Sequence, residues 1–194
     1  MEKGLSYQFP LFAKLQKEGK ITVEPLGDTG RWFKQTYAAT PASAITAHNA
    51  YDDDEKNSVW YCSKYYRINL YSDHGKLRVR DLHIFKEDFP DPFEDTVCPN
   101  NEATYEALPV VDGNIFSGNH VIAGAYPTDL SGHPIIPSAM QFTQNGKNSA
   151  LVDYGSIRFT LMENGLKITA DEDFVLEARF GKTDRQIGRA SCRE

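Results

Sequence analysis

The sequence predicts a mainly β fold, an antiparallel β-sandwich preceded by a short αβ piece. From Ser58 onward, apolar and polar residues alternate with a period of two through segments rich in Val, Ile and Tyr. This alternation is typical of strands that bury one face. Before that point, one helical pattern and one short strand-like run occupy residues 9–26. We therefore expect an αβ piece with its linker over residues 1–51 and a β-sandwich over residues 52–186.

The αβ piece is predicted to begin with a helix over Phe9–Lys20. Its apolar residues share one face at helical spacing, its lysines share the other, and Gly19 lies near its C-terminal end. A short strand is predicted over Ile21–Leu26. One helix and one strand cannot bury both faces of the strand, so the pattern implies neighbouring strands that this chain does not supply.

The candidate substrate-binding residues are Glu24, near the end of the predicted strand, and Asp28, Arg31 and Trp32 in the glycine-containing loop after it. In a β/α barrel, such positions face the active site. Carboxylates accept hydrogen bonds from sugar hydroxyls, arginine donates to oxygens, and tryptophan stacks on a sugar ring. The alternative is an ordinary ion pair between Asp28 and Arg31, with Trp32 packed against another domain.

The β-sandwich is predicted to begin after the acidic run Asp52–Glu55, which indicates a solvated linker. Val59–Cys62 and Tyr65–Tyr71 are predicted to form a hairpin, and Lys76–Phe85 a third strand. In this third strand the apolar residues change faces near Asp81, which predicts a bulge or a strand end.

A long loop over residues 86–119 is predicted to separate these strands from the later ones. It contains one apolar patch, Leu108–Val111. Strands are expected at Val121–Tyr126 and Ala139–Thr143. The last part is predicted to be a three-stranded meander, in which Asn164-Gly165 is a strong hairpin signal. Its strands are Ser156–Met162, Leu166–Ala170 and Phe174–Phe180.

Composition excludes several classes of partner. The net charge of −6 argues against binding to a nucleic-acid backbone. No apolar run approaches the length of a membrane span, and Met1–Pro10 lacks the pattern of a signal peptide. We therefore expect neither nucleic acid nor membrane as a partner. The protein would be cytoplasmic if Met1 is the true start, and its location is otherwise unknown.

Known catalytic motifs are missing from the sequence. It contains no G-x-S-x-G, H-E-x-x-H, Walker A or Rossmann pattern, and its histidines are dispersed. We therefore assign no catalytic residue, no metal ligand and no cofactor to this chain. Cys62 and Cys98 favour one buried thiol and one loop thiol over a disulfide bond. Ile187–Glu194 resemble a translated sequencing adaptor and are excluded as an artefactual tail.

Three stretches carry a resemblance to a known group of proteins: residues 17–37, residues 58–85 and residues 105–114. They resemble the C-terminal portion of large bacterial proteins related to polysaccharide deacetylases and glycoside hydrolases. In those proteins a catalytic (β/α) barrel ends in a G-E/D-T/S-G-R-W-F loop and is followed by a β-sandwich. Asp28, Gly30, Arg31 and Trp32 match positions of this loop.

The resemblance implies that the αβ piece is the last unit of such a barrel, whose earlier units would be a partner missing from this chain. The parent enzyme would hydrolyse or deacetylate a polysaccharide, and the fragment alone would be inactive. A divalent metal, if the parent uses one, would lie in the missing barrel. The alternative is a non-catalytic module that binds glycans or packs on a partner domain. Its candidate aromatics are Tyr61, Tyr65, Tyr66 and Tyr71, for which core packing is the competing role.

Overall fold

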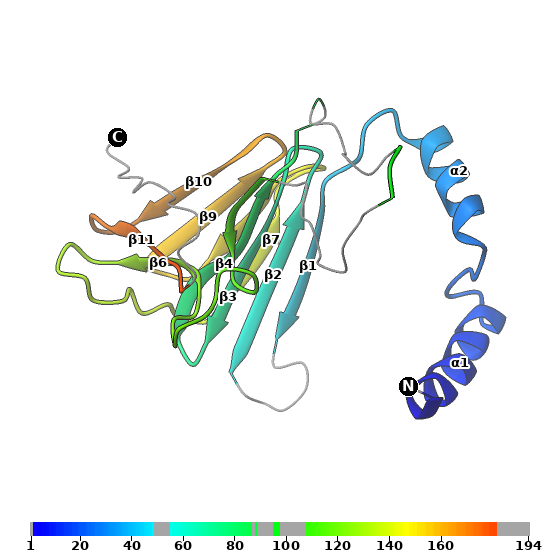
Figure 1. Ribbon diagram of the computed structural model, residues 1–194, viewed down its shortest axis with the longest axis horizontal. Coiled ribbons are helices and arrows are strands. Elements are labelled where there is room, and N and C mark those ends of the chain that lie inside the picture. Colours follow the sequence, from blue (N-terminus) through cyan, green and yellow to red (C-terminus); the bar gives the residue numbers. More distant parts are fainter. Residues whose placement is uncertain (1, 49–54, 87, 89–94, 98–107, 182–194) are drawn as a thin grey trace. The chain divides into compact units, whose positions relative to one another are not determined.

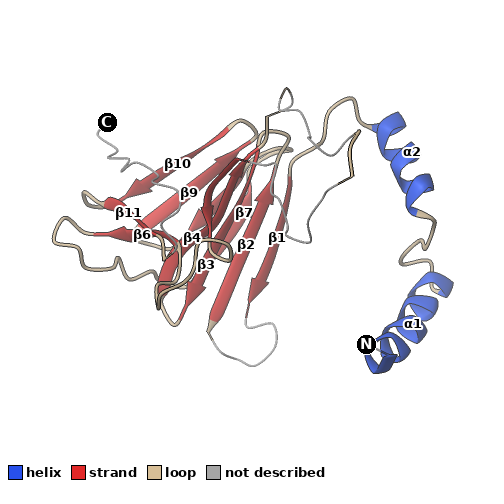
Figure 2. Ribbon diagram, viewed as in Figure 1, coloured by secondary structure: helices blue, strands red, loops and turns tan. Residues whose placement is uncertain are grey.

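The computed structural model describes residues 2–48, 55–86, 88, 95–97 and 108–181 (Figure 1). The described residues form two helices and eleven strands, so the fold is mainly β as predicted (Figure 2). The chain divides into two compact units, Met1–Thr40 and Pro41–Glu194. None of the helices in the described ranges is long and apolar enough to cross a membrane.

The first unit begins with helix α1 (Glu2–Lys17), which confirms the predicted helix but starts earlier than Phe9. Gly19 ends it with a φ of +70°, a conformation that glycine adopts without steric cost. The amides of Gly19 and Lys20 donate to carbonyls of the last turn at 3.0 and 2.9 Å. These two hydrogen bonds form a Schellman motif, which explains why the helix ends at its lysine-rich last turn.

The prediction of a strand over Ile21–Leu26 is wrong. Residues 21–25 form no regular structure, and helix α2 (Leu26–Thr36) replaces the predicted loop. A strand needs hydrogen-bond partners on a neighbouring strand, and no described residue pairs with this segment. Pro25 is extended before the helix, and Asp28 in its first turn interacts favourably with the helix dipole. That the first unit derives from a barrel stays a prediction.

The second unit contains two antiparallel sheets. The larger has the strand order β1-β2-β3-β4-β6-β11, with β5 also paired to β4, and the smaller has the order β10-β9-β8-β7 (Figure 1). The larger sheet consists of β1 (Ser43–His48), β2 (Lys56–Cys62), β3 (Tyr66–Asp73), β4 (Lys76–Ile84), β5 (Leu108–Asp112), β6 (Gly124–Thr128) and β11 (Val175–Arg179). The smaller consists of β7 (Gln141–Gln144), β8 (Ala150–Asp153), β9 (Ile157–Met162) and β10 (Gly165–Ala170).

One hydrophobic core joins the two sheets. Ile68 and Leu70 of the larger sheet and Phe159 and Leu161 of the smaller sheet are fully buried in the same cluster. Because each sheet buries alternate residues against the other, the second unit has the sandwich arrangement that the period-two pattern predicts.

Strand β1 lies in the segment predicted to be a linker. It pairs along its whole length with β2, from Ser43 opposite Cys62 to His48 opposite Asn57. The compact units therefore divide between Thr40 and Pro41 and not at residue 51. The segment was missed because its small residues carry little apolar contrast, whereas its stability comes from pairing. Residues 52–54 of the acidic run lie outside the described residues.

The prediction of a terminal meander is wrong for its last strand. The β9–β10 hairpin forms as predicted, but β11 pairs with β6 in the other sheet. The connection after β10 is fixed by Asp171, whose amide donates to the carbonyl of Ser156 at 3.0 Å and whose carboxylate accepts from Arg158 at 2.8 Å. Period-two alternation shows that a segment is a strand, but it does not show which sheet the strand joins.

The predicted irregularity in β4 is confirmed as a β-bulge. Asn69 of β3 pairs with Asp81, whereas Leu70 pairs with Val79, so Arg80 is left without an opposite residue. Beyond the bulge the faces are exchanged: Leu82 packs against the core, and Asp81 lies on the outer face of the sheet.

Buried tyrosines give the first testable prediction. Burial raises the pKa of Tyr66 and of Tyr154 far above the ordinary value of about 10. Because folding favours their neutral forms, this stabilisation is fully present below about pH 10 and is lost above it, where the unfolded chain releases these protons. In an alkaline titration, we expect these two phenols to ionise only as the protein unfolds. Full phenolate absorbance at 295 nm with a native circular dichroism spectrum would contradict this.

Candidate functional site

A pocket of about 470 Å³ lies on the outer face of the larger sheet. The residues that line it come from β2, β3, β4, the end of β5 and the turn after it. They are Trp60, Arg67, Arg78, Arg80, Asp81, Asp112, Gly113 and Asn114. A volume of this size suits a small ligand, and aromatic and charged side chains in one hollow are typical of binding sites.

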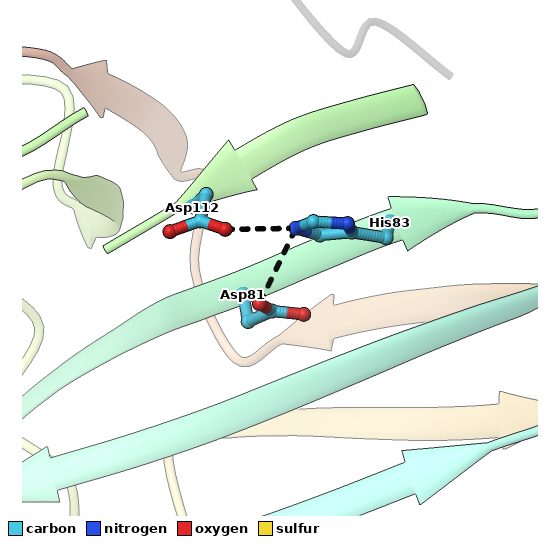
Figure 3. A group of neighbouring side chains, drawn as sticks. All are labelled: Asp81, His83 and Asp112. Carbon is cyan, nitrogen blue, oxygen red and sulfur yellow. Dashed lines mark hydrogen bonds and ion pairs between the residues drawn. The ribbon is translucent and has the colours of Figure 1, made fainter. Parts of the chain in front are cut away.

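Three buried side chains form a cluster that includes two of these lining residues (Figure 3): Asp81, His83 and Asp112. The Nε2 atom of His83 lies 3.0 Å from an oxygen of Asp112 and 3.4 Å from an oxygen of Asp81. Because carboxylates only accept hydrogen bonds, the short contact places a proton on Nε2. The Nδ1 atom of His83 is buried without a hydrogen-bond partner among the described residues.

Arg67 completes this group from the neighbouring strand. Its Nε and Nη2 atoms donate to the two oxygens of Asp81 at 2.9 and 3.1 Å. Two parallel charge-assisted bonds of this kind fix both the position and the plane of a guanidinium group. Asp81 is thereby engaged on both oxygens, and the bulge at Arg80 is what turns Asp81 toward Arg67.

The turn after β5 is held by the carboxylate of Asp112. One of its oxygens accepts from the backbone amides of Asn114 and Ile115, both at 2.8 Å. Gly113 packs against the bulge, where a β-carbon would lie 2.8 Å from the Cγ atom of Arg80. Only glycine therefore fits at this close approach, and the turn fixes one wall of the pocket against Arg80.

Arginine and aromatic side chains form the other walls. The guanidinium of Arg80 lies 4.6 Å from the ring centre of Tyr71 and 5.8 Å from that of Trp60. The guanidinium of Arg67 lies 5.9 Å from the Trp60 ring. These distances fall within the range of cation–π contacts. Burial, together with the charge of Arg78, lowers the pKa of Arg80 from its ordinary value.

The cluster of Asp81, His83 and Asp112 has the donor types of a metal site, with one ligand atom from each residue within 4.8 Å of the others. However, Arg67 already binds both oxygens of Asp81, and its Nη2 atom lies 3.4 Å from Nε2 of His83. A metal ion there would face this fixed positive charge at short range. The residues fit a closed ion-pair network better than a cation site.

We therefore expect divalent cations to leave the protein's stability unchanged. A ligand that binds only the folded state raises the melting temperature as its concentration exceeds its dissociation constant. Millimolar Mg²⁺, Ca²⁺ or Zn²⁺, each compared with EDTA, should shift the melting temperature by less than about 1 °C. A saturable increase that disappears in an Asp112→Asn variant would show that the cluster binds metal.

The four residues predicted from sequence lie in the first unit, in or just before α2. Glu24 accepts a hydrogen bond from the hydroxyl of Thr29 at 2.7 Å. Asp28 and Arg31 form an exposed ion pair one helical turn apart. Trp32 is about half exposed and lies edge-on to Tyr37. The contact of Asp28 with Arg31 is the ordinary ion pair that was the alternative to a sugar site.

Sequence reasoning did not identify the pocket. The available signals were the change of apolar face near Asp81 and the turn pattern Asp112-Gly113-Asn114. Tyr61 and Tyr66 are buried in the core, the role that competed with glycan binding, whereas the ring of Tyr71 lies against the guanidinium of Arg80.

Comparison with models of protein families, with curated proteins and with solved structures finds no match to this chain. The resemblance to polysaccharide-processing enzymes therefore stays a prediction, and the function has to be argued from the pocket itself.

Proposed function

We propose that the β-sandwich unit is a glycan-binding module and that the pocket on its outer face is the binding site. The observation that carries the proposal is that Trp60 and three arginines line one hollow on the sheet face opposite the core. Sugars combine apolar C–H faces with many hydroxyls, so they are bound by flat rings flanked by hydrogen-bond donors.

The polar groups of the pocket fit binding better than catalysis. His83 has a side chain only 1% exposed, so a substrate could not reach it without rearrangement. Both oxygens of Asp81 are held by Arg67. A general acid or base must be free to exchange a proton with the substrate, and neither the buried His83 nor the fully engaged Asp81 is free in this way. We therefore infer that the module binds its ligand without turnover.

A role beside a catalytic domain is a second proposal, which a separate observation favours. The first unit leaves large apolar side chains exposed, among them Phe9, Phe12 and Trp32 at 60%, 42% and 52%. Exposed apolar groups at this density are typical of a surface that contacts another domain. A polysaccharide hydrolase or deacetylase barrel would supply such a surface in the intact parent.

The test of glycan binding compares the chain's two tryptophans. Titration calorimetry with a panel of oligosaccharides should detect a ligand for the wild-type protein. Trp60→Ala should weaken binding at least about tenfold, which corresponds to about 1.4 kcal/mol. Trp32→Ala is the matched control and should leave the affinity unchanged. The reverse result would move the site to the first unit, where the sequence predicts it, and the absence of any ligand would refute the proposal.

A further inference from the structure

We propose that the pocket selects an acidic saccharide, a sugar that carries a carboxylate or sulfate group, and that Arg80 contacts this group. The inference rests on the proposed glycan-binding function and narrows the class of ligand. It follows from which arginines of the pocket form ion pairs within the protein and which do not.

Arg80 is a half-buried cation that forms no ion pair at contact distance with a carboxylate among the described residues. Its guanidinium lies between the rings of Tyr71 and Trp60, at 4.6 and 5.8 Å, and makes no hydrogen bond or ion pair with the described residues. Taking a guanidinium out of water is unfavourable, and ring faces compensate only part of the lost hydration. Burial and then Arg78 lower the pKa of Arg80, and the opposing effects of Tyr71 and Asp81 are smaller, which agrees with this imbalance.

The carboxylates of the pocket form their hydrogen bonds and ion pairs with other groups, so Asp81 acts on Arg80 only through its charge at longer range. Asp81 is bound on both oxygens by Arg67. Asp112 accepts from His83 and from two backbone amides. Arg78 donates from its Nη1 atom to two neutral oxygens, a backbone carbonyl and a tyrosine hydroxyl. Neither Arg78 nor Arg80 therefore forms an ion pair at contact distance with a carboxylate among the described residues.

An anionic group on the ligand would supply the missing partner. A guanidinium presents a planar fork of N–H groups that matches a carboxylate or sulfate in a bidentate arrangement. The apolar surface of Trp60 lies in the same pocket and can contact the sugar ring. Because the whole chain has a net charge of −6, general attraction for polyanions is disfavoured, and recognition has to come from the local arginines.

The experiment uses the full chain and ligand pairs that differ in charge. Oligogalacturonate is compared with its methyl ester, and a sulfated galactan oligosaccharide with its desulfated form. We expect at least one charged ligand to bind about ten times more tightly than its neutral partner. This preference should decrease when the NaCl concentration is raised from about 0.05 to about 0.5 M. Arg80→Gln should remove the preference, and Arg80→Lys, which keeps the charge but loses the fork, should retain only part of it.

Arg158→Gln is the matched control, because it removes one arginine from the other sheet, where Arg158 is paired with Asp153 and Asp171. The Arg158→Gln variant should prefer the charged ligand over the neutral one by the same factor as the wild type. Equal affinity for charged and neutral saccharides, or a preference that survives Arg80→Gln, would overturn the inference and leave glycan binding intact. If a short polyglutamate bound equally tightly, the pocket would still be an anion-binding site, but the proposal that its ligand is a saccharide would be overturned. If the variants unfold, the salt dependence of the wild type still decides the question.

Discussion

Replacing Arg67 with alanine is expected to lower the free energy of unfolding of the β-sandwich unit by about 3 kcal/mol. Arg67 holds both oxygens of Asp81, whose side chain is 10% exposed, and Asp112 lies on the other side of His83 with a side chain 7% exposed. Without the guanidinium, two buried carboxylates would share one imidazole. Removing one member of a buried ionic group leaves an uncompensated charge, which is more destabilising than losing an exposed pair.

The matched control is Arg31→Ala, which breaks the exposed ion pair with Asp28 in the first unit. Exposed pairs of this kind contribute little, so we expect a change within about 0.5 kcal/mol. Urea unfolding followed by circular dichroism measures both variants. Equal effects of the two substitutions would show that the Asp81, His83 and Asp112 cluster does not depend on Arg67.

Replacing Phe159 with alanine is expected to destabilise the same unit by about 3–5 kcal/mol. Phe159 is fully buried between the two sheets and lies edge-on to Tyr154, with ring centres 6.2 Å apart. Its removal loses apolar burial and leaves a cavity that a packed sandwich cannot close completely. The matched control is Tyr65→Ala, because Tyr65 is 46% exposed and the loss should be small. A similar loss for both would contradict the placement of the core between the sheets.

Strands of the β-sandwich could be predicted from the sequence where alternation is strong. Segments such as Tyr66–Asp73 and Ile157–Met162 combine period two with β-branched and aromatic residues, and both form strands. The change of face near Asp81 correctly indicated the bulge. By contrast, β1 is short of large apolar residues, so only its pairing with β2 reveals it.

The first unit shows where the same pattern fails. Ile21–Leu26 has strand-like composition, yet no described residue offers it a partner, and the glycine-containing segment after it forms α2. Glycine in a helix costs about 1 kcal/mol relative to alanine, so propensity alone argued for a loop. Glu24, predicted near the end of this strand, and Trp32, predicted in the loop after it, accordingly lie before and within a helix.

The pocket could not be predicted because its residues meet only through tertiary pairing. Asp81 and Asp112 are brought together by the pairing of β4 with β5, and Arg67 by the pairing of β3 with β4. His83 is one of five dispersed histidines, and nothing in its local sequence marks it as buried between two carboxylates. Strand register, and not spacing along the chain, determines which charges are paired within the protein.

The most direct test of ligand binding in the pocket is a nuclear magnetic resonance titration that follows the two indole N–H signals, one from each compact unit. On addition of the best acidic oligosaccharide, the Trp60 signal should shift with saturation while the Trp32 signal stays in place. A shift of the Trp32 signal with an unchanged Trp60 signal would contradict the account and place the ligand on the first unit.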